Sequence, residues 1–237
     1  MDVIRSLEHV EKVVPLHARI SYCTCCFGRD WQLAPALAMN MWSQLPYLRS
    51  GSVRFVISLI EGTDKESKNQ QTQTITLLKT WFSEEIRKGW LVVGLSGDEF
   101  FQSCRHKNRA HKLALLCGWG AEQLDEGPGL AGVFEEPYPK NHITHWLVNV
   151  DADNILPTSF PHEVLKELEK TCGTVRPKGV AGFRCCTGGT DSGVTGRVGL
   201  TAERFLMLGG YNEAFHPRMP GHGLVCTDQV APVCVVL

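Results

Sequence analysis

The sequence predicts an α/β domain in which helices flank a mostly parallel central sheet. Short apolar segments of strand length alternate with segments of helical periodicity, and residues 53–60 and 90–97 are apolar along most of their length. Strands that helices bury on both faces have this continuous apolar pattern, whereas strands buried on one face alternate. Strands that alternate with helices favour a parallel sheet with right-handed crossovers.

The elements follow in order from residue 18. We expect strands at 18–25, 53–60, 90–97, 144–153 and 179–186, and helices at 30–48, 74–89, 103–118, 161–170 and 201–208. Asp30 can cap the first helix, and Gly89 ends the second, because glycine is common just past a helix C-terminus. Three segments are predicted loops: the polar residues 61–73, the Gly- and Pro-rich residues 118–141, and the glycine-rich residues 187–199.

Composition and charge argue against two classes of function. The 237 residues are 43% hydrophobic and 21% charged, with a formal net charge of −1. This is an ordinary globular composition without the basic excess that neutralises phosphates, so nucleic acid is not an expected partner. No apolar run reaches the ~20 residues of a transmembrane helix, and the amphipathic start "MDVIRSLEHVEKVV" has no apolar signal core. We therefore expect a cytoplasmic protein without a transmembrane segment.

The cysteines are expected to be reduced. There are ten of them, and no CxxC…HxxxH zinc-finger pattern appears. Thiols that pack in strands as small hydrophobic side chains account for them better than a metal or redox role does.

Two aspartates end the apolar run in "HWLVNVDADNIL" (145–156). Residues two apart on a strand point to the same side, so Asp151 and Asp153 would bring like charges close together. Such a pair is costly unless a cation compensates it, and hard divalent cations prefer oxygen ligands. The pattern therefore predicts a Mn²⁺ or Mg²⁺ site, with Asp151 and Asp153 as ligands, that anchors a diphosphate.

Two other interpretations of this pair stay open. One is a structural turn in which Asp153 caps the following helix. The other, a glycosidase acid/base pair, fits less well because those carboxylates flank a scissile bond at about 5–10 Å. The metal site is favoured because the aspartates follow the fourth predicted strand, and ligands bind at the carboxyl edge of such sheets.

Other polar residues fall at the same predicted edge. Asn108 and Arg109 open a predicted helix, where the helix N-terminus and a guanidinium can bind an anion. Glu61 and Asp64 follow the second strand and can accept hydrogen bonds from a base or ribose. A solvated basic face and a solvated loop are the respective alternatives.

The segment "GGYNEAF" (209–215) provides candidates on the acceptor side. Gly210 allows positive φ or close approach of another backbone. Tyr211 can stack on a sugar face or belong to the core. Glu213 can accept a hydrogen bond from an acceptor hydroxyl.

In four stretches the chain resembles A-type-fold nucleotide-sugar glycosyltransferases, with most similarity to the family-two-like and β-1,4-galactosyltransferase-like inverting enzymes. "LVNVDADNIL" resembles their metal-binding DxD strand, and "HKNRAHKLAL" (106–115) an NRA-type helix start. "GRVGLTAERFLMLGGYNEAF" (196–215) and "GHGLVCTDQ" (221–229) resemble the acceptor-side segments. The order and spacing of the four stretches carry the resemblance.

This resemblance implies one Rossmann-like domain over residues 1–237, with a nucleotide-sugar half at 18–153 and an acceptor half at 154–237. It implies a hexosyltransferase that moves a sugar from a nucleotide diphosphate, most commonly UDP, to a hydroxyl of a glycan, lipid or protein. Arg29 lies where the family places a nucleotide contact. Asp151, nearer the ribose, and Asp153, the direct ligand, would bind the metal.

The resemblance also implies single displacement with inversion, in which the metal neutralises the departing diphosphate and a carboxylate removes the hydroxyl proton. Asp228 is the expected base. The chain departs from the family here, because Cys226 stands near the base position and the ending "QVAPVCVVL" lacks the expected helix and histidine. We therefore expect a C-terminus that is truncated or altered.

Three further function classes remain open. A nucleotide-sugar-binding protein of the same fold without turnover is the main alternative, because of the departures around Asp228. A sugar nucleotidyltransferase is another, although the first strand is followed by only one glycine in "CTCCFGRDW". A structural or interaction domain is the third.

Overall fold

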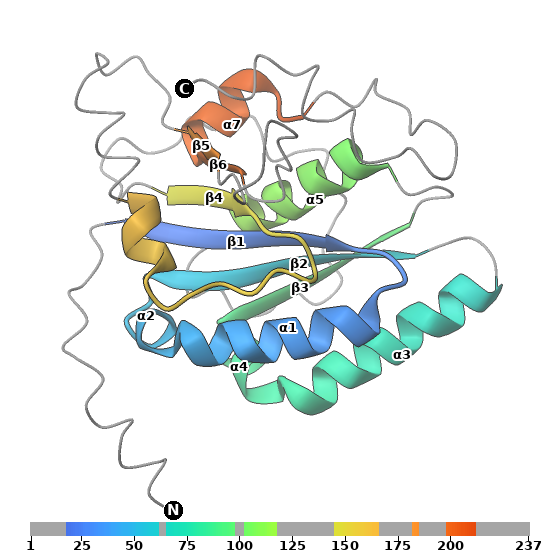
Figure 1. Ribbon diagram of the computed structural model, residues 1–237. Coiled ribbons are helices and arrows are strands. Elements are labelled where there is room, and N and C mark those ends of the chain that lie inside the picture. The colour runs from blue at the N-terminus through green and yellow to red at the C-terminus, as the bar shows by residue number, and fades with distance from the viewer. Residues whose placement is uncertain are drawn as a thin grey trace, which may run out of the picture.

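One six-stranded sheet organises the residues that the computed structural model describes, which are 18–61, 65–97, 102–117, 145–165, 182–184 and 198–211. Its strands are β1 (Arg19–Cys26), β2 (Val53–Glu61), β3 (Leu91–Gly97), β4 (His145–Asn149), β5 (Gly182–Arg184) and β6 (Val198–Thr201). The order is β3-β2-β1-β4-β6-β5 (Figure 1). Strands β1 to β4 pair in parallel, and β6 runs antiparallel to β4 and β5. The predicted α/β fold with a mostly parallel sheet is confirmed.

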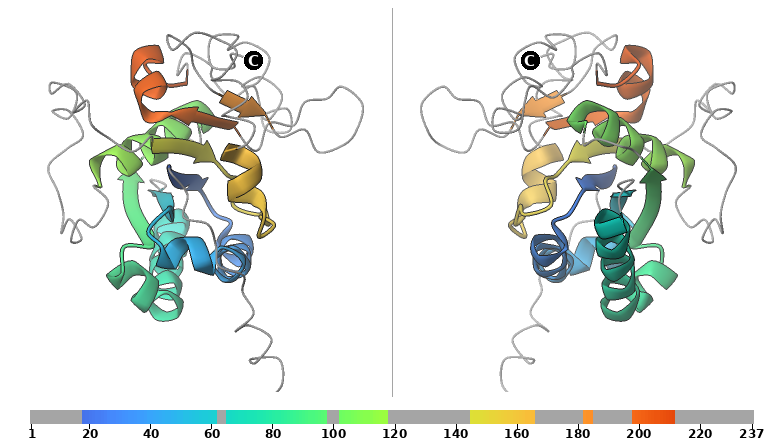
Figure 2. Two further views of the ribbon diagram at one scale, coloured as in Figure 1. Left: turned by 90° about the vertical axis from the view of Figure 1, so that its left-hand side faces the viewer. Right: turned by 90° about the vertical axis from the view of Figure 1, so that its right-hand side faces the viewer.

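Helices cover both faces of this sheet (Figures 1 and 2). They are α1 (Asp30–Ser43), α2 (Leu45–Arg49), α3 (Lys65–Trp81), α4 (Ser83–Arg87), α5 (Ser103–Leu116) and α7 (Ala202–Leu208), and residues 160–165 are also helical. Among the described helices, none combines the length and apolar character needed to cross a membrane.

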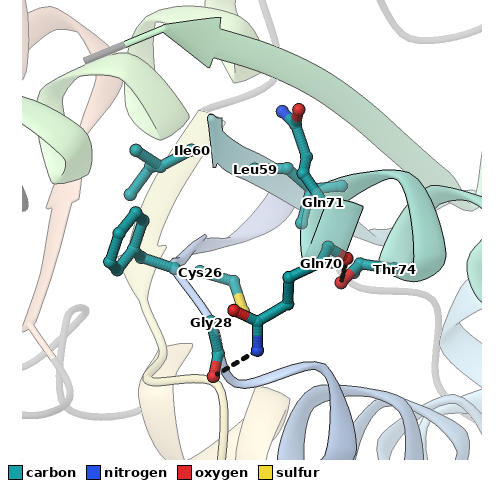
Figure 3. A pocket seen from close by; sticks show the side chains of 8 residues that line it. Cys26, Gly28, Leu59, Ile60, Gln70, Gln71 and Thr74 are labelled. Carbon is teal, nitrogen blue, oxygen red and sulfur yellow. Dashed lines mark hydrogen bonds between the residues drawn. The ribbon is translucent and has the colours of Figure 1, made fainter. Parts of the chain in front are cut away.

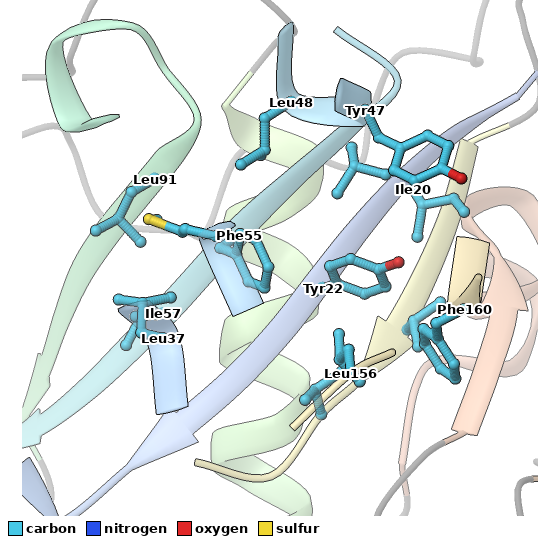
Figure 4. Packing of buried hydrophobic residues seen from close by; sticks show 14 of the residues in the cluster. Ile20, Tyr22, Leu37, Tyr47, Leu48, Phe55, Ile57, Leu91, Leu156 and Phe160 are labelled. Atoms are coloured by element: carbon cyan, nitrogen blue, oxygen red, sulfur yellow. The ribbon is translucent and has the colours of Figure 1, made fainter. Parts of the chain in front are cut away.

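Alternating side chains of the strands supply two cores, one on each face. Tyr22 lies in the core beneath α1, with its ring centroid 5.2 Å from Phe55 and 5.9 Å from Phe160 (Figure 4). Cys23, the next residue, belongs to the core on the other face, which α5 and α7 cover. The central strands are therefore buried on both sides, as their continuous apolar sequences predict.

The described cysteines fit the predicted role of packed thiols. Cys23 and Cys26 are free thiols that lie in opposite cores, because residues three apart on a strand point to opposite faces. Burial raises the pKa of the neighbouring Cys25 thiol to about 12, so it is protonated at neutral pH.

Two predicted loops differ from the structure. Helix α3 begins at Lys65, within the predicted loop 61–73, and Thr72 and Thr76 each donate a hydrogen bond to the carbonyl four residues earlier. Its first turns are polar and lack an apolar stripe, so their periodicity gave no helix signal. Strand β6 lies partly in the predicted glycine-rich loop. Its residues form a strand because they pair with β4, and their composition alone does not favour a strand. The predicted loop 118–141 lies outside the described residues.

A buried arginine connects the sheet to α5. Arg54, on β2, is only 2% exposed. Its guanidinium donates to the carbonyls of Ala114 and Cys117 at the end of α5, and its Nε donates to the Ser21 hydroxyl at 2.9 Å. Ser21 Oγ lies 2.8 Å from Nε2 of His145 on β4. Burial, and then the charge of Arg54, lower the pKa of His145 to about 3, so the imidazole that hydrogen-bonds Ser21 is neutral at physiological pH.

Substitution of Arg54 by methionine is expected to destabilise the fold. The variant leaves buried carbonyls at the end of α5 without their donor, and each such group costs about 1–3 kcal/mol. Urea denaturation should give a free energy of unfolding lower by about 2–4 kcal/mol. Arg49→Met, at an exposed arginine that ends α2, is the control and should change it by less than about 0.5 kcal/mol. Equal effects of the two substitutions would contradict this role.

Candidate functional site

The candidate site lies where the order of the strands reverses. Strand β1 is flanked by β2 on one side and by β4 on the other, so the connections after β1 and β4 lead to opposite sides of the sheet. In open α/β sheets, ligands bind outside the carboxyl ends of the strands at this reversal. Arg29 follows β1, and Asp151 and Asp153 follow β4, at this edge.

The two aspartates lie in a turn rather than on the predicted strand 144–153. Strand β4 ends at Asn149, and the amide of Asn154 donates to the Asp151 carbonyl at 3.0 Å. This hydrogen bond closes a four-residue turn, because it joins residues three apart. The turn leaves Asp151 half-buried, while the side chain of Asp153 is 48% exposed. Strand geometry therefore does not hold the two carboxylates on one side.

Side chains of β1 and α1 hold the backbone on both sides of this turn. Before the turn, the hydroxyl of Thr24 donates to the carbonyl of Val150 at 2.8 Å. After it, the buried amide of Asn40 donates to the Asn154 carbonyl at 2.8 Å and accepts from the Leu156 amide at 2.7 Å. The aspartates therefore project from a backbone that is fixed at both ends.

Two cations approach the carboxylates. The guanidinium Nη1 of Arg29 lies 3.9 Å from Asp153 Oδ2, and both side chains are about half exposed, so water weakens this pair. Burial raises the pKa of Asp151, and the nearby charge of Lys107 is the largest opposing influence. The Asn149 amide also donates to Asp151 Oδ1 at 3.5 Å. Arg29 and Lys107 thus partly compensate the negative charges of Asp151 and Asp153, for which the sequence pattern predicted a metal cation.

Helix α5 brings Lys107 and Asn108 to the other side of the site. Lys107 Nζ lies 5.9 Å from the centroid of the Tyr211 ring. The Asn108 amide, only 1% exposed, donates to the Tyr211 carbonyl at 2.8 Å and accepts from the Tyr211 amide at 2.7 Å. Gly210 has φ +84°, and a Cβ there would collide with Asn108 Oδ1. The glycine is therefore required for this approach.

The structure brings some predicted site residues together and leaves others unplaced. Arg29, Asp151 and Asp153 share the edge, and Asn108, Gly210 and Tyr211 meet next to Lys107. The prediction that Asn108 and Arg109 open a helix is wrong, because α5 begins at Ser103 and both residues lie in its second turn. Arg109 is half-buried, and Glu61 ends β2, although its side chain lies outside the described part. Asp64, Glu213 and Asp228 also lie outside the described residues.

Lys107 is a site residue that the sequence pattern does not single out, because residues 105–112 contain several basic side chains. Its 9% exposure, beside Asp151 and Tyr211, is what distinguishes it. Arg105 on the same helix is exposed and Arg109 and Lys112 are half-buried, a difference that only the packing of α5 against β4 reveals.

A small pocket lies beside the candidate site, at the carboxyl ends of β1 and β2 (Figure 3). Its lining residues are Cys26, Phe27, Gly28, Leu59, Ile60, Gln70, Gln71 and Thr74. Gly28 has φ +62°, and its carbonyl accepts a hydrogen bond from the Gln70 amide at 3.3 Å. The glutamines come from the part of α3 that the sequence predicted as a loop, so the sequence did not indicate this pocket.

The carboxylates are chemically suited to a hard divalent cation. Two monodentate carboxylates, together with water or phosphate oxygens, are a common set of ligands for Mg²⁺. In the described part of the chain, no group of three or more His, Cys, Asp or Glu side chains could hold a metal. Asp151 and Asp153 would therefore need solvent or ligand oxygens to complete the coordination.

Comparison with known proteins gives no match, either to a protein-family model or to a curated protein.

The pH dependence of stability should report the burial of Asp151. Its pKa is raised in the folded state, so this carboxyl favours folding when protonated and opposes it as the pH rises through its folded pKa. In metal-free buffer, Asp151→Asn should therefore be more stable than the parent protein near pH 7. The difference should shrink as the pH falls through the raised folded pKa, and it should be absent below the pKa of unfolded aspartate, about 4.

Urea denaturation from pH 3 to 8 measures this difference. Asp153→Asn is the control, because the side chain of Asp153 is 48% exposed. A lower stability of Asp151→Asn at pH 7 would contradict the raised pKa.

Proposed function

We propose that this protein is a nucleotide-sugar-dependent glycosyltransferase of the A-type fold that uses Mn²⁺ or Mg²⁺. Its donor would be a nucleotide-diphosphate sugar, most commonly a UDP-sugar, and its acceptor a hydroxyl of a glycan, lipid or protein. One observation carries the proposal: two carboxylates and two cations meet at the carboxyl edge of a mostly parallel sheet where the strand order reverses.

The charges at this edge suit a diphosphate. Asp151 and Asp153 are the carboxylates that would hold the metal, which when bound supplies positive charge to the departing diphosphate. Arg29 and Lys107 would offer further donors to phosphate oxygens. Arg29 and Lys107 already lie near the aspartates. The negative charge of a bound diphosphate would therefore offset the positive charge that the metal adds to this group.

The transfer would be a single displacement with inversion. Asp228 accepts the proton of the acceptor hydroxyl, whose oxygen bonds to the anomeric carbon opposite the departing diphosphate. Tyr211, whose backbone Asn108 holds, provides an aromatic side chain next to Lys107. Glu213 lies two residues later in the chain and is proposed to bind the acceptor.

A binding protein of the same fold without efficient turnover is the second candidate. The sequence "GLVCTDQ" carries Cys226 two residues before Asp228. If Cys226 rather than Asp228 occupies the position of the base, a thiol would be a poor general base for a sugar hydroxyl. Donor binding would then persist because it depends on Arg29, Lys107 and the two aspartates.

Asp153→Ala should abolish the manganese-dependent stabilisation of the protein by nucleotide diphosphates. A ligand at 100 times its Kd stabilises the folded state by about 2.7 kcal/mol, and loss of the metal ligand should remove this effect. Thermal shift with UDP, with and without Mn²⁺, measures it. Glu84→Ala is the control, because Glu84 is an exposed carboxylate paired with Arg87 on α4. Unchanged affinity of Asp153→Ala for the Mn²⁺–UDP complex would rule out this metal site.

Asp228→Asn should separate the two candidates. If Asp228 is the base, the variant should retain its calorimetric affinity for the donor, while the transfer rate falls by about 10²–10⁴-fold. The measurements are the Kd of a UDP-sugar and its Mn²⁺-dependent turnover, in the parent and the variant. Micromolar binding by the parent without turnover would favour the binding protein. Transfer that survives Asp228→Asn unchanged would assign the base to another residue.

A further inference from the structure

Helix α1 covers one face of the sheet (Figure 1), and its outer side is apolar as well. Among its described side chains, the exposed ones are Trp31, Pro35, Met39 and Trp42. Trp31 is 70% exposed, Met39 54% and Trp42 67%. The opposite side of α1 already belongs to the core. Helices that are apolar all round are normally buried on all sides.

These exposed side chains form one stripe. At 100° per residue, Trp31, Pro35 and Trp42 project within an arc of about 40°, and Met39 extends the arc to about 80°. We call these four residues the α1 stripe. Two indole rings and a thioether on one face are typical of an interaction surface rather than of scattered apolar residues.

The absence of charge on this helix favours a second copy of the chain as the partner. Residues 31–43 contain no Asp, Glu, Lys, Arg or His. Helices that lie on a lipid surface carry Lys and Arg beside their apolar face, and a charged partner would find no opposite charge on this one. An uncharged face can meet a copy of itself without repulsion between like charges.

The order of the side chains in the α1 stripe also suits contact with itself. A two-fold interface uses the same patch on both subunits. Trp31 and Trp42 lie at the two ends of the stripe, about 16 Å apart along the helix axis, and Pro35 and Met39 lie between them. If two α1 helices cross in antiparallel directions, Trp31 meets Trp42 of the partner subunit and Pro35 meets Met39 of the partner subunit.

The area of the α1 stripe matches what a stable dimer needs. The two tryptophans alone expose about 300 Å², because an aromatic side chain has about 150–250 Å² of surface, and with Met39 and Pro35 the stripe offers roughly 450 Å². A homodimer interface of ordinary size buries about 800 Å² on each subunit, of which about 65% is apolar, or about 500 Å². The half-buried Gln32 and Ser43, which border the stripe, can supply part of the polar rim.

We propose that this chain forms a two-fold dimer through the α1 stripe, with the two α1 helices antiparallel. The contact buries four tryptophans at one interface, two from each subunit. It is independent of the proposed transferase function, because the stripe contains none of the residues assigned to the metal, the diphosphate or the acceptor.

Sedimentation equilibrium of the full chain tests the dimer. Interfaces of this size have Kd values from micromolar to picomolar, so at a concentration of about 50 µM the mass should be twice the 26.3 kDa of one chain. Trp31→Gln and Trp42→Gln should each raise the Kd of the dimer at least tenfold, because each substitution removes two buried tryptophans per dimer. Trp81→Gln, at a tryptophan on α3 that is 59% exposed, is the control and should leave the Kd unchanged.

Two double variants test the antiparallel pairing. Trp31→Glu combined with Trp42→Lys places opposite charges against each other twice per dimer, whereas Trp31→Lys combined with Trp42→Lys places like charges there. At low salt, the first variant should dimerise with a Kd at least tenfold lower than that of the second, and added salt should reduce the difference. Equal values for the two variants would overturn the antiparallel arrangement.

Three other outcomes would overturn the proposal. The first is a monomer in the parent protein at about 50 µM, a concentration well above a micromolar Kd. The second is a dimer whose Kd changes in neither Trp31→Gln nor Trp42→Gln. The third is a monomer that binds phosphatidylcholine vesicles and loses this binding in Trp42→Gln, which would assign the α1 stripe to a lipid surface. Circular dichroism checks that each variant remains folded.

Discussion

The hydrogen bonds of Arg54 are the interaction on which the arrangement of the site depends. A charged guanidinium, buried in the sheet, is tolerated because the last carbonyls of α5 and the Ser21 hydroxyl accept its protons. These bonds fix the C-terminal end of α5 against β2. Because a helix is rigid, they also determine where its other end presents Lys107 and Asn108. Through Ser21, the same arginine links β2 to β1 and to His145 of β4.

The turn of Asp151 and Asp153 is fixed by neutral hydrogen bonds rather than by charge. Thr24 and Asn40 hold its backbone from two different elements, so the carboxylates can remain near one another without a strong ion pair. The pair with Arg29 is long and exposed. If a cation binds here as proposed, it would therefore not have to displace a strong ion pair.

The sequence predicted the parts of the fold whose signals are local. The apolar strands β1, β2 and β3 appeared almost where they were expected, because burial on both faces leaves a continuous apolar pattern. The first turns of α3 have no apolar stripe, and β6 is defined by pairing with β4, so neither could be found from periodicity. For the site, the predicted strand ends placed Asp151 and Asp153 at the carboxyl edge of the sheet, and the structure shows that Arg29 lies next to Asp153 there. The position of Lys107 beside Asp151 depends on how α5 packs against the sheet, and a sequence pattern does not contain that information.

The contact between Asn108 and Tyr211 is sensitive to the exchange of a single atom. The side-chain amide of Asn108 hydrogen-bonds both the backbone N–H and the backbone carbonyl of Tyr211, as a residue of a neighbouring strand would. Deamidation replaces its nitrogen with oxygen, and the resulting carboxylate would face the Tyr211 carbonyl with a second acceptor and a buried charge. Conversion of this one residue to aspartate would therefore weaken the hold of α5 on Tyr211, although aspartate has the same length and shape as asparagine.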